Sequence, residues 1–152
     1  MTTGRDIVAL TDELCRHPTG VVAPGNDALF DRIERELPIR RRAFASGESH
    51  NGWRVPESWR VEEATLWRDG RLVHDAAAHP LGVAMQSRSF EGELSGGELR
   101  RHIVSDPARP DARIFHCRWQ YRPWEADWAL CLPHGEAARL DDGPHRVRLR
   151  VA

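Results

Sequence analysis

The residues best suited to chemistry are concentrated between Ile114 and His134. This stretch contains two of the three cysteines, two of the eight histidines, three of the six tryptophans and the only tyrosine. Thiolate and imidazole groups are zinc ligands and form nucleophile–base pairs, and clustered aromatic rings line binding pockets. The segment therefore suggests three hypotheses: a metal site, a reactive thiol and an aromatic binding site.

A zinc site would have to use neighbouring residues. The candidate ligands are His116, Cys117, Cys131 and His134. We interpret His116 and Cys117 as part of a strand, where adjacent side chains point to opposite faces of the sheet. Both could reach one ion only across a bulge. We therefore predict no metal site and no cofactor, and we expect Cys117 and Cys131 to be core residues.

A reactive cysteine needs partial exposure and a base that lowers its pKa. His116 and His134 are the candidate bases for Cys131, but Cys131 lies in the apolar run Ala129–Leu132, which indicates burial. The third cysteine, Cys15, is distant in sequence, and no CxxC spacing occurs. We expect three small, buried side chains with free thiols, and no catalytic residue.

The aromatic residues are the stronger functional lead. Four lie between positions 119 and 128: Trp119, Tyr121, Trp124 and Trp128. On the expected strand Trp119 and Tyr121 share one face, with Arg118 and Arg122 on the other. Apolar surface beside charge suits a small zwitterionic or peptide ligand, with core packing as the alternative. The predicted ligand-binding residues are His116, Arg118, Trp119, Tyr121, Trp124, Trp128 and Trp53.

The elements that position these residues are predicted from periodicity. Apolar residues at helical spacing indicate two amphipathic helices before residue 38: Ile7, Leu10 and Leu14, then Leu29, Ile33 and Leu37. Asn26-Asp27 is a plausible N-cap for the second helix, which ends at Pro38. The sequence predicts an α+β fold, mainly antiparallel, forming a single domain over 1–152 with a helical segment at 1–38 and a β-rich part at 39–152.

Short extended runs fill the β-rich part. The expected strands cover 39–44, 53–56, 61–67, 71–74, 81–85, 90–94, 113–121, 128–132 and 145–151. Asp69-Gly70 predicts a hairpin turn. Ser95 and Glu98 have capping-box spacing, which predicts a short helix. The last strand alternates apolar residues with Arg146, Arg148 and Arg150. This arginine row either binds anions or forms a solvated strand face, and we favour the solvated face.

Composition excludes several classes of function. The formal net charge is −1 although 30% of residues are charged, so neither nucleic acid nor an anionic membrane is an expected partner. All 22 basic residues are arginine, a bias typical of a GC-rich, bacterial genome. There is no apolar N-terminal run like that of a signal peptide, and no apolar stretch approaches the ~20 residues of a membrane span. We expect a cytoplasmic protein.

Several motifs occur together in an order that resembles one family. They are Arg16-His17-Pro18-Thr19-Gly20, Ser46-Gly47, Gly52-Trp53-Arg54-Val55-Pro56-Glu57-Ser58-Trp59, Leu81-Gly82-Val83, Gln86-Ser87, Gln120-Tyr121 and Trp128-Ala129-Leu130-Cys131. This order is similar to that of the aminopeptidase-like proteins, which are related to zinc peptidases and carry an inserted β-rich domain of unknown function (DUF2172, DUF4910). The resemblance covers the N-terminal helices and the inserted domain.

The chain also departs from that pattern. Gly52 stands where the family usually has Asp, Gly82 where it has His, Gln86 where it has Tyr, and Ala129-Leu130 where it has Gly-Phe. The zinc ligands of the family's peptidase core would follow the last residue of this sequence, and nothing here matches them. The resemblance therefore implies a divergent β-rich module without peptidase activity of its own.

Three functional hypotheses result. The first is a non-catalytic module that binds a small ligand, a peptide or a partner protein. The second is a small biosynthetic hydrolase or amide-processing enzyme that uses the aromatic pocket with His116 or His134 as acid or base. The third is that this chain supplies the missing domain of a split zinc aminopeptidase whose core is a separate protein.

Overall fold

The computed structural model describes residues 4–152, with side chains from residue 6 onward. The chain divides into two compact units, Met1–Trp59 and Arg60–Ala152. The expected change from helix to strand after residue 38 falls within the first unit. This division describes how the residues pack, and it does not say whether either unit folds by itself. The single-domain organisation therefore stays a prediction.

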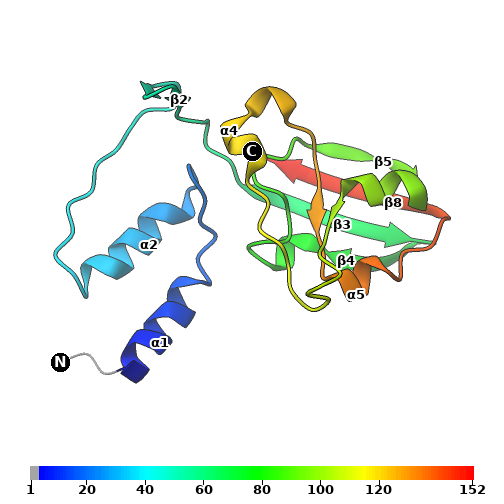
Figure 1. Ribbon diagram of the computed structural model, residues 1–152, viewed down its shortest axis with the longest axis horizontal. Helices are drawn as coiled ribbons and strands as arrows, with labels where there is room; N and C mark the ends of the chain where they lie inside the picture. The colour runs from blue at the N-terminus through cyan, green and yellow to red at the C-terminus, as the bar shows by residue number, and fades with distance from the viewer. Residues whose placement is uncertain (1–3) are drawn as a thin grey trace. The chain divides into compact units, whose positions relative to one another are not determined.

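The first unit contains two helices and a small hairpin (Figure 1). These are α1 (Gly4–Leu14), α2 (Gly25–Glu34), β1 (Ser49–His50) and β2 (Trp53–Arg54). Both predicted helices are present, and the Arg32 guanidinium donates to the Glu13 carboxylate across them at 2.8 Å. The turn between the strands places Asn51 and Gly52 at positive φ.

Two predictions in this unit are wrong. The residue before α2 is Pro24, and no side chain caps the helix. Asn26 instead exchanges two hydrogen bonds with the backbone of Gly20, which fixes the preceding loop. Residues 39–44 form no strand, because they have no strand to pair with and Arg41 is bonded to Asp31 and Glu34 of α2.

The second unit is built on a four-stranded antiparallel sheet in the order β4-β3-β8-β5 (Figure 1). The strands are β3 (Val61–Arg68), β4 (Arg71–Asp75), β5 (Phe90–Ser95) and β8 (Pro144–Val151). All four were predicted. Asp69 and Gly70 both have positive φ, as a tight hairpin turn between β3 and β4 requires. The α+β prediction is confirmed.

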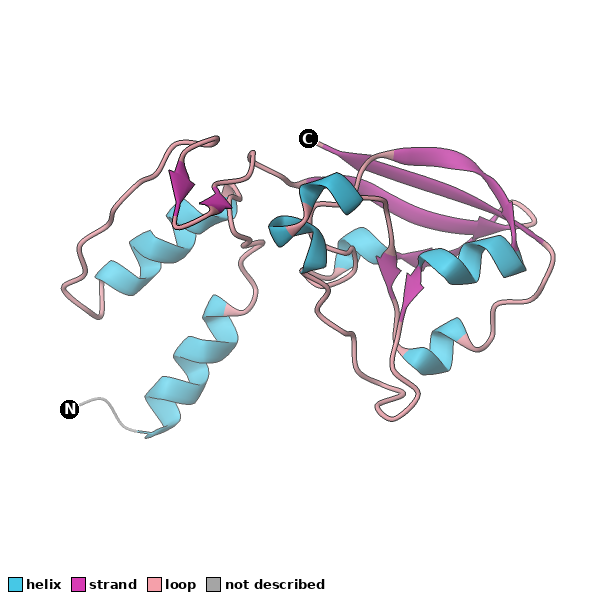
Figure 2. Ribbon diagram, turned by 45° about the horizontal axis from the view of Figure 1, so that its top comes forward, coloured by secondary structure: helices cyan, strands magenta, loops and turns pink. Residues whose placement is uncertain are grey.

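Side-chain alternation gives this sheet a buried face and an open face. Ala64 and Leu66 of β3 lie beside Leu149 and Val147 of β8, and all four are buried. Burying each of the larger side chains contributes about 1.5–3 kcal/mol. Arg146, Arg148 and Arg150 occupy the opposite face. Figure 2 shows the short helices and a small strand pair on one side of the sheet only.

Short elements cover the buried face. They are η1 (Ala76–Ala78), α3 (Gly96–Leu99), η2 (Arg100–His102), β6 (Ile103–Val104), α4 (Arg118–Tyr121), η3 (Pro123–Glu125), β7 (Leu130–Cys131) and α5 (His134–Ala137). Strands β6 and β7 pair in parallel. The predicted capping box is confirmed: the Glu98 N–H donates to Ser95 Oγ, and the Ser95 N–H donates to the Glu98 carboxylate.

Three expected strands are wrong or reduced. Residues 113–117 are irregular and 118–121 form α4, because Trp119 and the adjacent Gln120 are both buried and a strand cannot bury neighbours on one face. Residues 81–85 contribute only an isolated bridge, Val83 to Leu130. The strand expected at 128–132 shortens to β7.

Candidate functional site

Two of the predicted pocket residues belong to the core. Trp119 packs with Ala84, Ala129 and Cys131. Trp128 is stacked between Phe90 and His102, with ring centroids 4.4 and 4.0 Å away. The His102 Nδ1–H donates to the Trp128 carbonyl, which orients the imidazole against the indole. These contacts leave neither tryptophan free to form a pocket wall.

Tyr121 and Trp124 have the opposite character. Their exposed fractions are 59% and 75%, and Phe115 is also more than half exposed. We call Phe115, Tyr121 and Trp124 the exposed aromatic segment. Tyr121 ends α4 and Trp124 lies in η3, so ordered backbone presents both rings to solvent. Exposed aromatic rings on ordered backbone are typical of recognition surfaces.

Arg118 and Arg122 do not lie on an opposite strand face as predicted. Both guanidinium groups bind the Glu125 carboxylate, at 2.6 and 3.2 Å. The two arginines are four residues apart on one turn, and Glu125 follows in η3. This three-residue ion cluster connects α4 to η3 and so helps to hold Trp124 in place.

His116 and His134 are both partly enclosed. Burial is the main cause that lowers the pKa of His116, and the charge of Arg118 adds to it. The His116 Nδ1 is buried without a hydrogen-bond partner, and its ring centroid lies 4.7 Å from that of Trp119. His134 has a polar neighbour, since its Nδ1 lies 3.1 Å from Ser105 Oγ.

The cysteines differ from one another. Cys131 is 1% exposed, and burial raises the pKa of its thiol to about 12, which confirms its expected place in the core. Cys117 is half-buried, and Cys15 is exposed just after α1, so the prediction of three buried side chains is wrong for Cys15. All three are free thiols. Residues 4–152 contain no group of three or more His, Cys, Asp or Glu side chains able to hold a metal ion.

The predicted set thus does not form one pocket within the second unit. Trp119 and Trp128 are core residues, Tyr121 and Trp124 are exposed, and the remaining polar members lie on the same segment. Trp53 belongs to β2 of the first unit and is half-buried there. Sequence periodicity could not have indicated α4, because a helix of four residues is too short to show a helical repeat.

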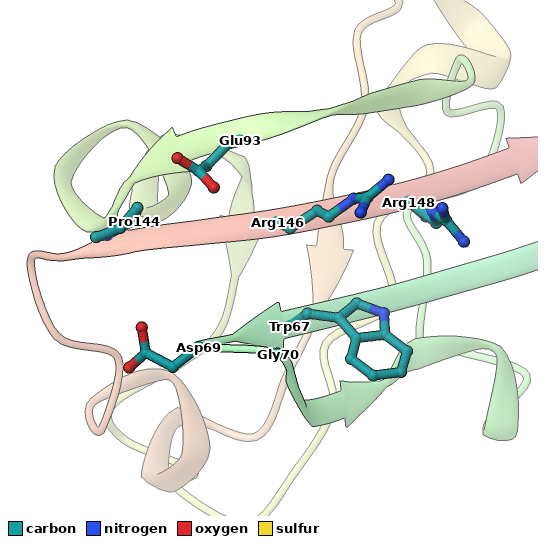
Figure 3. A pocket seen from close by; sticks show the side chains of 7 residues that line it. All are labelled: Trp67, Asp69, Gly70, Glu93, Pro144, Arg146 and Arg148. Atoms are coloured by element: carbon teal, nitrogen blue, oxygen red, sulfur yellow. The ribbon is translucent and has the colours of Figure 1, made fainter.

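A hollow of about 440 Å³ lies on the open face of the sheet (Figure 3). Trp67 of β3, Glu93 of β5, and Arg146 and Arg148 of β8 contribute side chains to it. Both arginines bind the Glu91 carboxylate at 3.0 Å, and Arg150 binds Glu63 at 2.8 Å. The arginine row is therefore paired along its length, which favours a solvated, ion-paired strand face over an anion site.

A second hollow, of about 490 Å³, was not anticipated from the sequence. Its lining includes the apolar side chains of Leu66, Leu132 and Leu140 together with His74, His145 and Glu136. We call it the His74 pocket. The inward alternation of β8 places His145 in line with Val147 and Leu149, so the burial of His145 could have been predicted. The contact between His74 and Glu136 could not, because it depends on where α5 lies against the sheet.

The fold and these surfaces define an α+β module with an antiparallel sheet covered on one face. The profile of one family, a domain of unknown function (DUF2172), matches residues 58–152, which include the whole second unit. The chain belongs to this family, which confirms the DUF2172 part of the resemblance. No curated protein matches the sequence.

A solved structure extends the likeness to the first unit. The crystal structure of a "putative peptidase" from Clostridium acetobutylicum matches 98% of this chain with a TM-score of 0.84 at 21% sequence identity. At that identity the likeness establishes the fold. The chain spans 35% of the length of that protein. In residues 4–152, no helix has the length and apolar character needed to cross a membrane.

Proposed function

We propose that this chain is a non-catalytic binding module of a peptidase-related protein, and that the exposed aromatic segment docks it on a peptidase core. The module would correspond to the inserted β-rich domain of the aminopeptidase-like, DUF4910-type proteins. The core belongs either to the same polypeptide or to a separate, cytoplasmic subunit. The observation that carries the proposal is the exposure of Tyr121 and Trp124 on ordered backbone.

The exposed segment has the composition of an interface centre. Aromatic residues and arginine are enriched at such sites, and a few well-placed aromatic side chains dominate binding energy. Here three exposed rings lie beside the Arg118–Glu125–Arg122 cluster. Trp119, the buried residue of α4, packs against Ala84, Ala129 and Cys131 and so attaches this surface to the core.

The structural neighbour supports the choice of partner. It is described as a "putative peptidase", and this chain matches about a third of its length. A fold that forms one part of a longer chain needs a surface for the rest. Residues 4–152 supply no group of metal-ligating side chains, so in this proposal the peptidase chemistry resides in the partner.

Site-specific crosslinking tests the docking. A photoreactive phenylalanine analogue replaces Trp124, and in a matched control it replaces Leu72, an exposed apolar residue of the edge strand β4. After irradiation in cells of the source organism, we expect position 124 to crosslink to a protein with a peptidase core, and position 72 not to do so. Mass spectrometry identifies the crosslinked peptide.

A second variant tests the energetics. Replacing either Tyr121 or Trp124 by alanine should weaken binding to the crosslinked partner by about 30-fold or more, because such an anchor contributes about 2 kcal/mol or more. Folding should be unaffected, because both side chains are mostly exposed. Equal crosslinking from positions 124 and 72, or capture only of proteins without a peptidase fold, would contradict the proposal.

The enzyme hypothesis is less well supported. Cys131 is excluded as a nucleophile by burial and a pKa of about 12. Ser105 and His134 form a pair at 3.1 Å, but an active serine also needs a group that orients the imidazole. The nearby Asp106 carboxylate is bonded to Arg109 and to the Ala108 N–H instead. The geometry therefore favours binding over catalysis.

A further inference from the structure

The His74 pocket lies on the covered side of the sheet, at the edge strand. β4 supplies His74, β8 supplies His145, and α5 supplies Glu136. A volume of about 490 Å³ lies within the range of small-molecule sites, which are mainly apolar with a few fixed polar groups. Leu66, Leu132 and Leu140 supply the apolar part of the lining.

Two buried imidazoles present acceptor nitrogens here. The His74 side chain is 8% exposed, and its Nδ1 lies 2.8 Å from the Glu136 carboxylate. His145 is 2% exposed, and its Nδ1 lies 2.9 Å from the Gly143 carbonyl. A carboxylate or carbonyl oxygen only accepts, so both Nδ1 atoms carry a proton, and in the neutral form of each ring the lone pair lies on Nε2.

The lone pair of His74 is unused. Its Nε2 is buried and has no hydrogen-bond partner. Leaving a buried acceptor unsatisfied costs about 1–3 kcal/mol, and such groups in native proteins are usually explained by a missing ligand, a water or a catalytic role. Because this nitrogen is covered in the structure, the His74 ring has to turn before a bound donor can reach it.

The charged groups of the lining are of two kinds. Arg68 and Asp141 neutralise each other at 3.2 Å, and Arg68 also donates to the Pro144 carbonyl. Glu136 has His74 as its partner, and Arg139 makes no ion pair within residues 4–152. One carboxylate, from α5, and one guanidinium, from the residue that follows the C-cap of α5, are therefore available to a ligand.

We propose that the His74 pocket binds a small zwitterion with an apolar body, such as an α-amino acid with a branched side chain. The ammonium group is recognised by the Glu136 carboxylate and the imidazole acceptors, the carboxylate by Arg139, and the apolar body by Leu66, Leu132 and Leu140. A pure cation or anion satisfies only half of this pattern. The inference is independent of docking through the exposed aromatic segment.

Three matched probes test the charge pattern by isothermal titration of the full chain. They are L-leucine, 3-methylbutylamine, which lacks the carboxylate, and 4-methylpentanoate, which lacks the ammonium group. We expect leucine to bind at least about tenfold more tightly than either partial analogue, because each hydrogen bond to a charged group is worth about 1.5–3 kcal/mol. Equal affinities for the three, or no binding of leucine at millimolar concentration, would overturn the proposal.

Two variants assign the ends of the ligand. E136Q keeps an oxygen for the His74 N–H but removes the charge, and should weaken leucine at least about tenfold while leaving 4-methylpentanoate unchanged. R139Q should weaken the binding of leucine at least about tenfold while leaving the binding of 3-methylbutylamine unchanged. Controls are E93Q and R101Q, exposed residues outside the pocket. If E136Q and R139Q bind leucine as the wild type does, the site is not where we place it.

Discussion

Trp124 and Cys131 lie only seven positions apart, yet their environments are opposite. The indole of Trp124 is the most exposed of the large apolar side chains, and the thiol of Cys131 has almost no contact with solvent. The sequence predicted a buried Cys131 and left Trp124 open between a binding pocket and the core. The structure confirms the first, since a thiolate is costly in an apolar core, and places the second on the surface, where its ring is available to a partner.

Cys131 should be inert to alkylation in the native protein. With a thiol pKa of about 12, only about one molecule in 10,000 carries the thiolate at pH 8. Cys15 is exposed and should react with iodoacetamide within minutes. Mass spectrometry of the alkylated peptides, with and without urea, checks this. Labelling of native Cys131 at the rate of Cys15 would show that the thiol is accessible.

His116 makes stability depend on pH near neutrality. Its folded-state pKa is lowered by burial, so the unfolded chain takes up a proton near pH 6.5 before the folded chain does. The free energy of unfolding is therefore at its full value above pH 6.5 and falls as the pH drops through 6.5 toward the lowered pKa. His79, whose pKa is lowered by burial and by Arg113, acts in the same direction.

Urea unfolding between pH 7.5 and 5.5 measures this effect. The carboxylates with lowered pKa, such as Asp106 and Asp141, contribute in the same direction but only below about pH 4.5. Between pH 7.5 and 5.5 the change in unfolding free energy therefore reports on the histidine imidazoles. H116N should be less sensitive to pH than the wild type. A wild-type stability that is flat over this range would contradict the assignment.

At the scale of elements, prediction succeeded where local pattern and packing agree. β8 alternates strictly, Asp69-Gly70 has turn chemistry, and Ser95 and Glu98 have capping spacing, so all three were found from the sequence. The prediction for residues 113–121 failed because β-favouring side chains such as Ile114, Phe115 and Trp119 indicate a strand, and the four residues of α4 are too few to show a helical repeat. No neighbouring strand is available there, and tertiary packing decides the outcome.

The start of α3 offers a matched pair of glycines. A Cβ at Gly96 would lie 1.8 Å from the Asp141 carbonyl oxygen, whereas one at Gly97 meets nothing within 4 Å. G96A should destabilise the protein by about 1–3 kcal/mol through overpacking. G97A should stabilise it by about 0.5–1 kcal/mol, because alanine favours the helix. Chemical denaturation of both variants checks the prediction. Equal changes in unfolding free energy for G96A and G97A would refute the close approach of Gly96 to the Asp141 carbonyl oxygen.

The His74 pocket illustrates why a site can escape sequence reasoning. His74 and Glu136 are separated by 62 positions, and neither spacing nor composition connects them. Only the placement of α5 beside β4 joins their side chains at 2.8 Å. The aromatic cluster between Trp119 and Trp128 was located from sequence, but its division into exposed and buried rings was not.

At the scale of the molecule, the second unit should fold alone. Its sheet and buried apolar residues lie within 60–152, and Arg60 and Ala152 exchange two backbone hydrogen bonds that close the end of the sheet. A fragment of residues 60–152 should unfold in a single cooperative urea transition. A fragment of residues 66–152 lacks most of β3 and should not fold.

Circular dichroism and the dispersion of amide proton resonances distinguish these outcomes. A folded 60–152 fragment would replace the single-domain prediction with two independent domains. A 60–152 fragment with an undispersed spectrum would mean that the second unit needs the first for stability.

The pairing of β3 with β8 also sets the earliest time at which the sheet can be completed during synthesis. Val61 pairs with Val151, and the interval between them is 151 − 61 = 90 residues. At a synthesis rate of ~5–20 residues per second, roughly 5–18 s pass between the synthesis of Val61 in β3 and that of Val151 in β8. During that interval Ala64 and Leu66 lack their neighbours on β8, Leu149 and Val147. The nascent chain should therefore depend on a ribosome-associated chaperone more than its small size suggests.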